Sequence, residues 1–405
     1  MSIKRFLLLS LFWMFSVFPA LFLSMASQAA PAIMLPDSSF DLQITSYLAT
    51  FEDKTQRLTI DDILTDRAQY KFNAHHDDNL RFGLTNSHYW LRFSITNPHP
   101  DDQSLVLSIS DNRLENIEFY EYKAGQLYHQ SSGALTKYKA QGSQLQAYPF
   151  LIKIEAKKNQ TYFIKLHSES AINSIVRLQS NDQFLQSQQF DFSILGMALG
   201  WVIATAAFFI FIWHFYRFRI ALISALYCLC IFVFIPSWQG QWAIWFPQSQ
   251  GWKNEITLIS IMAASILQII LAIKLDWSPD NSRNIKRCLK ALLTFNAAAT
   301  LIYLFMPSGA MSLLTLSTVI ISNIALIFIL LFAKSEHERA QFFLLIGHTV
   351  TAFGILLSIL TTHNYLAFDL IHAWAAIILP LIMISCTVFA NLSVIELYRE
   401  KREQQ

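Results

Sequence analysis

Seven long apolar runs occupy the second half of the chain. Each is about 18 to 25 residues long, the length that an α-helix needs to cross the ~30 Å hydrocarbon core of a bilayer. The runs are Phe192–Tyr216, Ile220–Trp238, Ile256–Ile273, Leu289–Met306, Ala310–Ala333, Ala340–Thr361 and Ile371–Ile395. The pattern therefore predicts a membrane protein with a seven-helix transmembrane α-bundle over residues 190–395.

Basic residues in this half lie almost entirely in alternate connections between the runs. The connections after the first, third, fifth and seventh runs hold Arg217, Arg219, Lys274, Arg283, Lys286, Arg287, Lys290, Lys334, Arg339, Arg399, Lys401 and Arg402. The other connections offer essentially only Lys253. Because cytoplasmic loops are enriched in Lys and Arg, the segment before the first helix is predicted outside and the tail, residues 396–405, inside. An outside domain joined to an inside tail by an odd number of helices is typical of a receptor.

The N-terminus has the pattern of a secretory signal peptide over residues 1–29. Lys4 and Arg5 precede an apolar stretch that ends at Met25, and a small-x-small cleavage pattern, Ser27-Gln28-Ala29, follows. The alternative is an uncleaved anchor, because the apolar stretch is long. In either case residues 30–189 are predicted to be exported. We therefore expect a bacterial inner-membrane protein with a periplasmic N-terminal domain and a cytoplasmic C-terminus.

Hydrophobic periodicity changes to two in the exported block. Leu91, Phe93 and Ile95 share one face of a predicted strand, whereas Trp90 and Arg92 share the other. Alternating apolar positions occur in four segments, namely Trp90–Thr96, Leu105–Ile109, Ile117–Tyr120 and Tyr162–Leu166. Several short antiparallel strands separated by turns favour an all-β, jelly-roll-like sandwich. One helical turn is also predicted near Thr59–Leu64, because Thr59 provides an N-cap-like start.

Composition excludes several classes of protein. The chain has 405 residues, of which 54% are apolar, and its net charge of +2 does not favour nucleic acid as a partner. We expect no cofactor and no enzyme activity, because no phosphate loop, nucleophile elbow or HExxH motif occurs. No disulfide is expected in the exported block, because all four cysteines lie in or at the ends of the predicted membrane helices. These cysteines are Cys228, Cys230, Cys288 and Cys386.

Three strand motifs in the exported block resemble those of a known family. They are a Trp-Leu-Arg strand that ends at Asn, a Leu-x-x-Ile-x-x-Tyr strand and a late Thr-Tyr-x-x-Lys strand. The positions are Trp90, Leu91, Arg92, Asn97, Leu114, Ile117, Tyr120, Thr161, Tyr162 and Lys165. This pattern resembles the jelly-roll extracellular domain of the bacterial seven-transmembrane receptors with diverse intracellular signalling modules (7TMR-DISM). The resemblance implies that the domain binds carbohydrate-like ligands.

The apolar half resembles the seven-helix module of the same family. The matched positions are Gly196, Gly200, Tyr227, Gly240, Trp245, Phe246 and Pro247. The seventh run departs from the family, since Pro380 occurs where an Ala-Asp-Arg-like step is common. Family members usually continue into a kinase, a cyclase or a phosphodiesterase, whereas this sequence ends at Gln405. We expect either a stand-alone receptor or a chain whose output domain is missing. Its cytoplasmic signalling partner would be a kinase, a diguanylate cyclase or a similar protein supplied in trans.

Two sets of candidate ligand-binding residues lie on predicted strands. Trp90 and Arg92 could stack on a sugar ring and bind its hydroxyl or carboxylate groups, and Tyr120 and Tyr122 share a face with Glu118 on another strand. The alternative is that both sheet faces are covered and Trp90 belongs to the core.

Polar side chains inside the apolar runs are a second kind of candidate, because polar groups in hydrocarbon normally face a bundle interior or a cavity. They could line a ligand cleft or form a switch network, or they could simply hydrogen-bond helices together. These residues are Gln268, Asn296, Asn323, His348 and Asn391. The cluster His75–Asp78 suggests a metal site only weakly, because no second His or Cys cluster completes it.

The sequence favours a signal-transduction receptor that senses a periplasmic ligand. One alternative is a transporter or membrane-enzyme component with a periplasmic accessory domain. The membrane half argues against it, because paired carboxylates at the midplane and inverted repeats are both missing from the pattern. Another alternative is a regulatory subunit that dimerises with full-length receptors. The ligand and the formation of a homodimer stay open.

Overall fold

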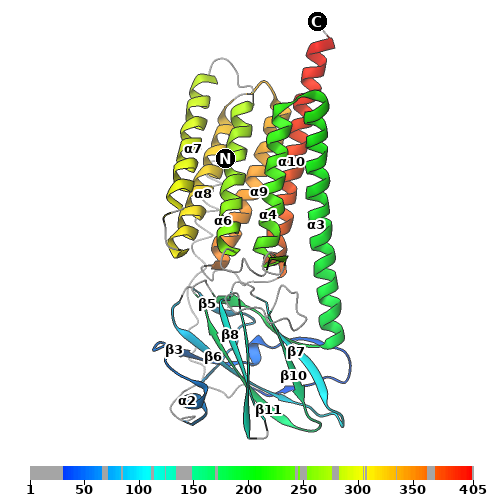
Figure 1. The fold of residues 1–405 in the computed structure, drawn as a ribbon, viewed down its shortest axis with the longest axis vertical. Coiled ribbons are helices and arrows are strands. Elements are labelled where there is room, and N and C mark those ends of the chain that lie inside the picture. The colour runs from blue at the N-terminus through cyan, green and yellow to red at the C-terminus, as the bar shows by residue number, and fades with distance from the viewer. Residues whose placement is uncertain are drawn as a thin grey trace, which may run out of the picture.

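A computed structural model shows a β domain joined to a bundle of long helices (Figure 1). It describes residues 31–403 except 66–71, 84, 111–113, 124, 134–147, 169–171, 242–244, 247–252, 276–281, 304, 306–307, 334 and 363–369. The predicted signal peptide lies outside the described residues.

The β domain is a sandwich of two large sheets with a small third sheet beside them. Sheet A has the order β4-β3-β6-β11-β8-β9, with β1 added in parallel to β6, and sheet B has the order β10-β7-β13-β2. Sheet A contains β1 (Ile33–Met34), β3 (Ala49–Asp53), β4 (Asn73–Ala74), β6 (His88–Thr96), β8 (Asn116–Lys123), β9 (Gln126–Ser132) and β11 (Asn159–His167). Sheet B contains β2 (Asp41–Gln43), β7 (Gln103–Ile109), β10 (Tyr148–Ile154) and β13 (Val176–Ser180), and sheet C pairs β5 (Leu80–Gly83) with β12 (Ile172–Ser174).

The main core lies between sheets A and B. Leu91, Phe93 and Ile95 of β6 are buried in it, as their period-two spacing predicts. Phe119 of sheet A stacks on Phe150 of sheet B with ring centroids 5.3 Å apart, which shows the two inner faces in contact. The predicted sandwich is therefore confirmed.

Two short helical segments complete the β domain. They are the 3₁₀ turn η1 (Thr45–Tyr47) and helix α2 (Ile60–Thr65). Thr59 lies just before α2, where its hydroxyl accepts from the Asp62 backbone nitrogen at 3.4 Å and the Asp62 carboxylate accepts from the Thr59 backbone nitrogen at 2.8 Å. The helical turn expected near Thr59–Leu64 is thus confirmed, with the capping residue expected from the sequence.

Seven long helices form the bundle among the described residues, as predicted. They are α3 (Asn181–Tyr216), α4 (Arg219–Trp238), α6 (Lys253–Lys274), α7 (Ser282–Tyr303), α8 (Ser308–Phe332), α9 (Glu338–Thr362) and α10 (Leu370–Glu403). Six of them are long and apolar enough to cross a membrane by length and composition. The exception, α7, carries Arg283, Lys286, Arg287 and Lys290 in its first turns, which lowers its hydropathy.

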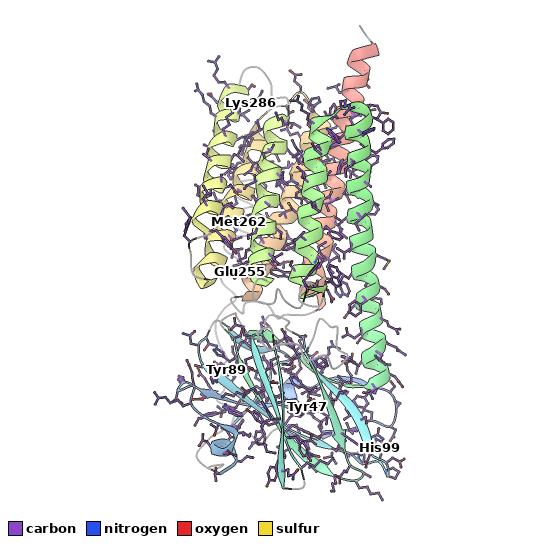
Figure 2. The ribbon with its side chains drawn as sticks, viewed as in Figure 1. Tyr47, Tyr89, His99, Glu255, Met262 and Lys286 are labelled. Atoms are coloured by element: carbon purple, nitrogen blue, oxygen red, sulfur yellow. The ribbon has the colours of Figure 1, made fainter. Side chains whose placement is uncertain are left out.

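The two ends of the bundle differ in what they carry. The β domain lies at one end, and the C-terminus lies at the other (Figure 1). Lys286 of α7 is at the end where the chain terminates, and Glu255 of α6 is at the end that faces the β domain (Figure 2). The basic first turns of α7 are therefore on the opposite side of the bundle from the β domain, which is the arrangement that the loop charges predict.

Candidate functional site

The outer face of sheet A, which points away from sheet B, holds most of the predicted ligand-binding residues. Strand pairing places Trp90 of β6 opposite Lys165 of β11, and Lys165 opposite Glu118 of β8. Side chains directly opposite each other on neighbouring strands share a face and lie in contact range. The next row along the strands contains Arg92, Phe163, Tyr120 and His129. A mixed aromatic and charged surface thus crosses four strands.

Trp90 is fully buried in a second, smaller core on this outer face. It packs with Ile60 and Ile63 of α2 and with Phe163, and none of its surface is exposed. The ammonium group of Lys165 lies 5.3 Å from the centroid of the Trp90 ring and donates to the Leu58 carbonyl at 3.2 Å. The outer face of sheet A is therefore covered at Trp90. The Trp90 ring has no exposed surface that could stack on a sugar.

Arg92 is half-buried beside the second core. Its guanidinium carbon lies 4.7 Å from the centroid of the Phe72 ring, which is a cation–π contact. Phe72 also packs against the second core. The Arg92 side chain is therefore in contact with Phe72, which directly precedes β4.

Tyr120 and Tyr122 lie where the outer face becomes open. Tyr120 stacks on Trp90 at 5.8 Å and on His129 at 4.8 Å, so one aromatic ladder leads from the buried region to the exposed strand β9. The Tyr120 hydroxyl donates to the Glu118 carboxylate. Tyr122 is 52% exposed, and His129 is also exposed. Of the four predicted positions, Tyr122 is the one whose ring is accessible.

Glu118 is a charged acceptor next to this open surface. Burial alone would raise the pKa of its carboxyl, but the Tyr120 hydrogen bond, the Lys165 charge and the Asn116 hydrogen bond together lower it. Glu118 is therefore ionised at neutral pH and can accept hydrogen bonds from hydroxyl groups. From the sequence, Glu118 is distinguished only by its position in the strand, and His129 was not among the predicted residues. The signal that could have found His129 is its period-two spacing from Leu127 and Ser131 after a Gly-containing turn.

Four of the five predicted polar residues in the bundle hydrogen-bond to another helix. Asn296 of α7 donates to the Ser322 hydroxyl of α8 at 2.8 Å and accepts from the Ser265 hydroxyl of α6 at 3.2 Å. The Asn323 oxygen of α8 lies 3.0 Å from Nδ1 of His348 on α9. These contacts are of the interhelical kind that holds membrane helices together.

Two further polar links join α10 to other helices of the bundle. Asn391 donates to the Ser224 hydroxyl of α4 at 3.0 Å, and Arg339 of α9 pairs with Glu396 at 3.2 Å. Gln268 differs from the other predicted residues, because its buried amide nitrogen and oxygen make no hydrogen bond with the part of the chain that the structure describes. The Tyr227 hydroxyl lies close to the Gln268 side chain, outside ordinary hydrogen-bond geometry.

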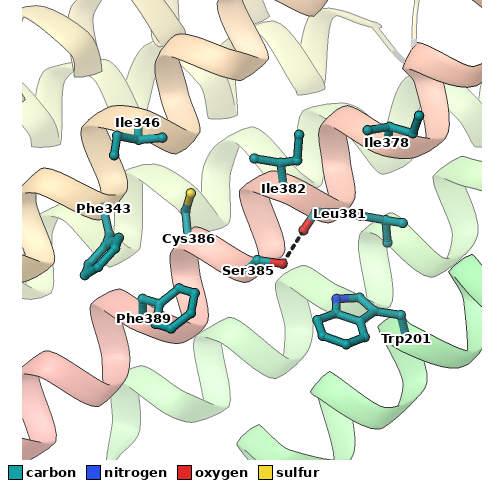
Figure 3. Close-up of a pocket in the computed structure, with 9 residues that line it drawn as sticks. All are labelled: Trp201, Phe343, Ile346, Ile378, Leu381, Ile382, Ser385, Cys386 and Phe389. Atoms are coloured by element: carbon teal, nitrogen blue, oxygen red, sulfur yellow. Dashed lines mark hydrogen bonds between the residues drawn. The ribbon is translucent and has the colours of Figure 1, made fainter.

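A groove of about 410 Å³ runs along α3, α9 and α10 within the apolar part of the bundle (Figure 3). Its only hydroxyl, on Ser385, donates to the Leu381 carbonyl of its own helix at 2.8 Å. The lining therefore offers mainly apolar contact. The lining residues are Trp201, Phe343, Ile346, Ile378, Leu381, Ile382, Ser385, Cys386 and Phe389.

Within the described residues, no three His, Cys, Asp or Glu side chains gather as a ligand set for a metal ion. His75, in the cluster that suggested a metal site, contacts the Asn79 carbonyl through Nε2 at 2.9 Å.

Comparison with known families gives two matches that together cover most of the chain. The model of the family described as 7TMR-DISM extracellular 2 matches residues 45–180. The model described as 7TM diverse intracellular signalling matches residues 191–399. A search of the curated proteins found no match.

Proposed function

The chain belongs to the 7TMR-DISM family, and from this premise we propose that it is a signal-transducing receptor of the bacterial inner membrane. The β domain would bind a ligand in the periplasm, and the bundle would pass the signal to a cytoplasmic partner such as a kinase or a diguanylate cyclase. The observation that supports this best is the direct join between β13 and α3. Ser180 ends the strand and Asn181 begins a helix that continues to Tyr216, so no flexible linker separates the β domain from the bundle.

Topology is the first requirement of this proposal. In a background where the four cysteines are replaced by serine, Gln126→Cys places a thiol on exposed strand β9, and Lys286→Cys places one at the opposite end of the bundle. A membrane-impermeant maleimide should label the first variant in intact spheroplasts and the second only after lysis. Equal labelling of both variants in intact spheroplasts would contradict the proposal.

The ligand is proposed to be carbohydrate-like and to bind on the open part of the outer face. Tyr122 provides an exposed ring, and Glu118 provides an ionised acceptor on the same strand. A screen of glycans and cell-wall fragments would identify a binder. Tyr122→Ala should then weaken binding by about tenfold or more, which corresponds to ~1.4 kcal/mol.

Tyr128 is a matched control for this experiment. It lies on the same hairpin, it is 50% exposed, and it pairs with Glu121, so it points to the opposite face of the sheet from Tyr122. Tyr128→Ala should leave the affinity unchanged. Equal losses in the two variants would show that the aromatic surface of sheet A is not the binding surface.

Signal transfer requires that the ligand move α10 relative to the other helices. Spin labels at Lys286→Cys on α7 and Glu400→Cys on α10 report this distance at the end of the bundle where the chain terminates. A ligand that binds the β domain should shift the distance distribution, because a ligand can change an equilibrium only by binding two states with different affinities. An identical distribution with saturating ligand would exclude transfer through α10.

A further inference from the structure

Two histidines face each other at one end of the central strand pair of sheet A. His88 begins β6 and His167 ends β11, and the pairing of Tyr89 with Leu166 places them opposite each other. Their ring centroids are 4.7 Å apart with an interplanar angle of 67°. Neither residue belongs to the exposed aromatic surface that carries the proposed ligand site.

Both imidazoles are partly enclosed by protein. The Nδ1 atom of each is buried and forms no hydrogen bond with any described residue. The charged groups that act on His88 come from three other strands: Lys165 on β11, Asp53 on β3 and Glu118 on β8.

The two carboxylates near the pair already have other partners. Asp53 accepts from the backbone nitrogens of Gln56 and Leu58 at 3.0 and 3.1 Å, and Glu118 accepts from Tyr120. Lys165, which lies two residues before His167 on the same strand face and donates to the Leu58 carbonyl, adds a positive charge that acts on His88. Burial, followed by the electrostatic effects of Lys165 and His167, lowers the pKa of His88, and Asp53 and Glu118 oppose this shift only in part.

The position of the pair connects it to the membrane helices. Tyr89, which follows His88, lies on the side of the β domain nearer the bundle, whereas His99, beyond the other end of β6, lies far from it (Figure 2). From His167 the chain passes through Ser168, which is fully buried, and then reaches β12, β13 and α3. A change at the end of β11 is therefore close, along the chain, to the start of α3.

We propose that the His88–His167 pair is a proton-binding site that makes the receptor sensitive to periplasmic pH. Uptake of a proton by His88 places a positive charge beside the second imidazole and within electrostatic range of Lys165, and the repulsion loosens the membrane-facing ends of β6 and β11. Histidine suits this role because its charge changes within the physiological range of pH. The link to signalling rests on the proposed receptor function, but the pH effect itself does not.

The direction of the effect follows from linkage. A histidine whose pKa is lower in the folded state than in the unfolded state takes up its proton more readily when the structure opens. The local structure is then most stable above the unfolded pKa of about 6.5 and becomes less stable as the pH falls below it. Each pKa unit between the two states corresponds to a tenfold change in the opening equilibrium once both forms are protonated.

Hydrogen exchange of the full-length protein in lipid nanodiscs tests the proposal. Exchange at pH 7.5 and pH 5.5, corrected for the intrinsic effect of pH, is compared for peptides from β6 and β11 and for reference peptides from β7 and β10. In the wild-type protein, exchange of the β6 and β11 peptides should rise several-fold at pH 5.5, with little change in the reference peptides. The double variant His88→Gln/His167→Gln should lose this rise.

The control variant is His76→Gln, which removes an exposed histidine and should keep the wild-type response. A corrected exchange rate that does not change with pH in the wild-type protein would overturn the proposal, and so would a double variant that responds like the wild type. If the Gln variant does not fold at pH 7.5, the Asn double variant replaces it, and the wild-type comparison still decides. The labelling and glycan experiments are done at pH 7.5, so they test the receptor function separately.

Discussion

Trp90 shows how strand alternation can place a residue on the correct face of a sheet without showing whether that face is covered. Its ring is enclosed by α2 and neighbouring side chains, with no exposed surface. Trp90→Ala should therefore lower the free energy of unfolding of the β domain by about 3–5 kcal/mol, because it removes a large side chain from a core and leaves a cavity. Equilibrium urea unfolding of a fragment comprising residues 31–180 measures this change.

Tyr122→Ala is the companion measurement for Trp90→Ala. Because the Tyr122 ring is half exposed, its removal should change the free energy of unfolding by about 0.5 kcal/mol or less. Equal losses of stability in the two variants would show that burial of Trp90 in the second core does not stabilise the β domain.

The sequence was sufficient to predict which way Trp90 points, but not what covers it. Strand alternation places Trp90 and Arg92 opposite Leu91 whatever the rest of the chain does. The cover depends on Ile60 and Ile63 returning over the outer face, and on Phe72 packing beside them. A short amphipathic helix gives no signal of which sheet face it will bury, because either face would satisfy its apolar side.

Two polar residues in the bundle should respond oppositely to replacement by leucine. Asn296 links three helices, so Asn296→Leu should lower stability by about 1 kcal/mol, within the range measured for interhelical hydrogen bonds. Gln268 is buried with both amide atoms unpaired among the described residues, so Gln268→Leu should leave stability unchanged or raise it. Thermal unfolding in detergent compares the two variants, and a larger loss for Gln268→Leu would point to an unrecognised partner of its amide.

At the scale of elements, glycine allows the close approach of α9 and α10. A Cβ atom added at Gly347 would collide with the Met383 sulfur and lie 3.2 Å from Cβ of Cys386. Gly347→Leu should therefore destabilise the bundle by about 1–3 kcal/mol through overpacking.

Gly200 on α3 is the control for this substitution. An added Cβ there meets no atom within 4 Å, so Gly200→Leu should leave the melting temperature of the full-length protein in detergent near that of the wild type. Similar melting temperatures for the two leucine variants would mean that the α9–α10 contact does not limit stability.

Helix existence could be predicted well from hydropathy, whereas helix ends could not. The first apolar run begins at Phe192, but α3 begins at Asn181, because its polar first turns form helix without contributing hydropathy. The seventh run ends at Ile395, but α10 continues through a charged segment to Glu403 for the same reason. Apolar length reports the thickness of the hydrocarbon, and a helix can extend beyond it on both sides.

At the scale of the whole molecule, the β domain has the features of an independent folding unit. It has its own core between two sheets, and none of the four cysteines lies in it. A fragment of residues 31–180 should therefore be soluble and β-rich by circular dichroism, with a melting curve that a reductant does not change. A helical or unfolded fragment would show that the β domain requires the bundle.

The unbroken course of α3 has a mechanical consequence. Its 36 residues span about 54 Å at 1.5 Å per residue, which is longer than the bilayer core is thick. A rod of this length that pivots by about 5° about its start at the β domain moves its far end by about 5 Å, close to the rise of one helical turn. A subtle tilt of the sandwich would thus produce a lateral displacement at the opposite end of the bundle, without any helix having to unwind.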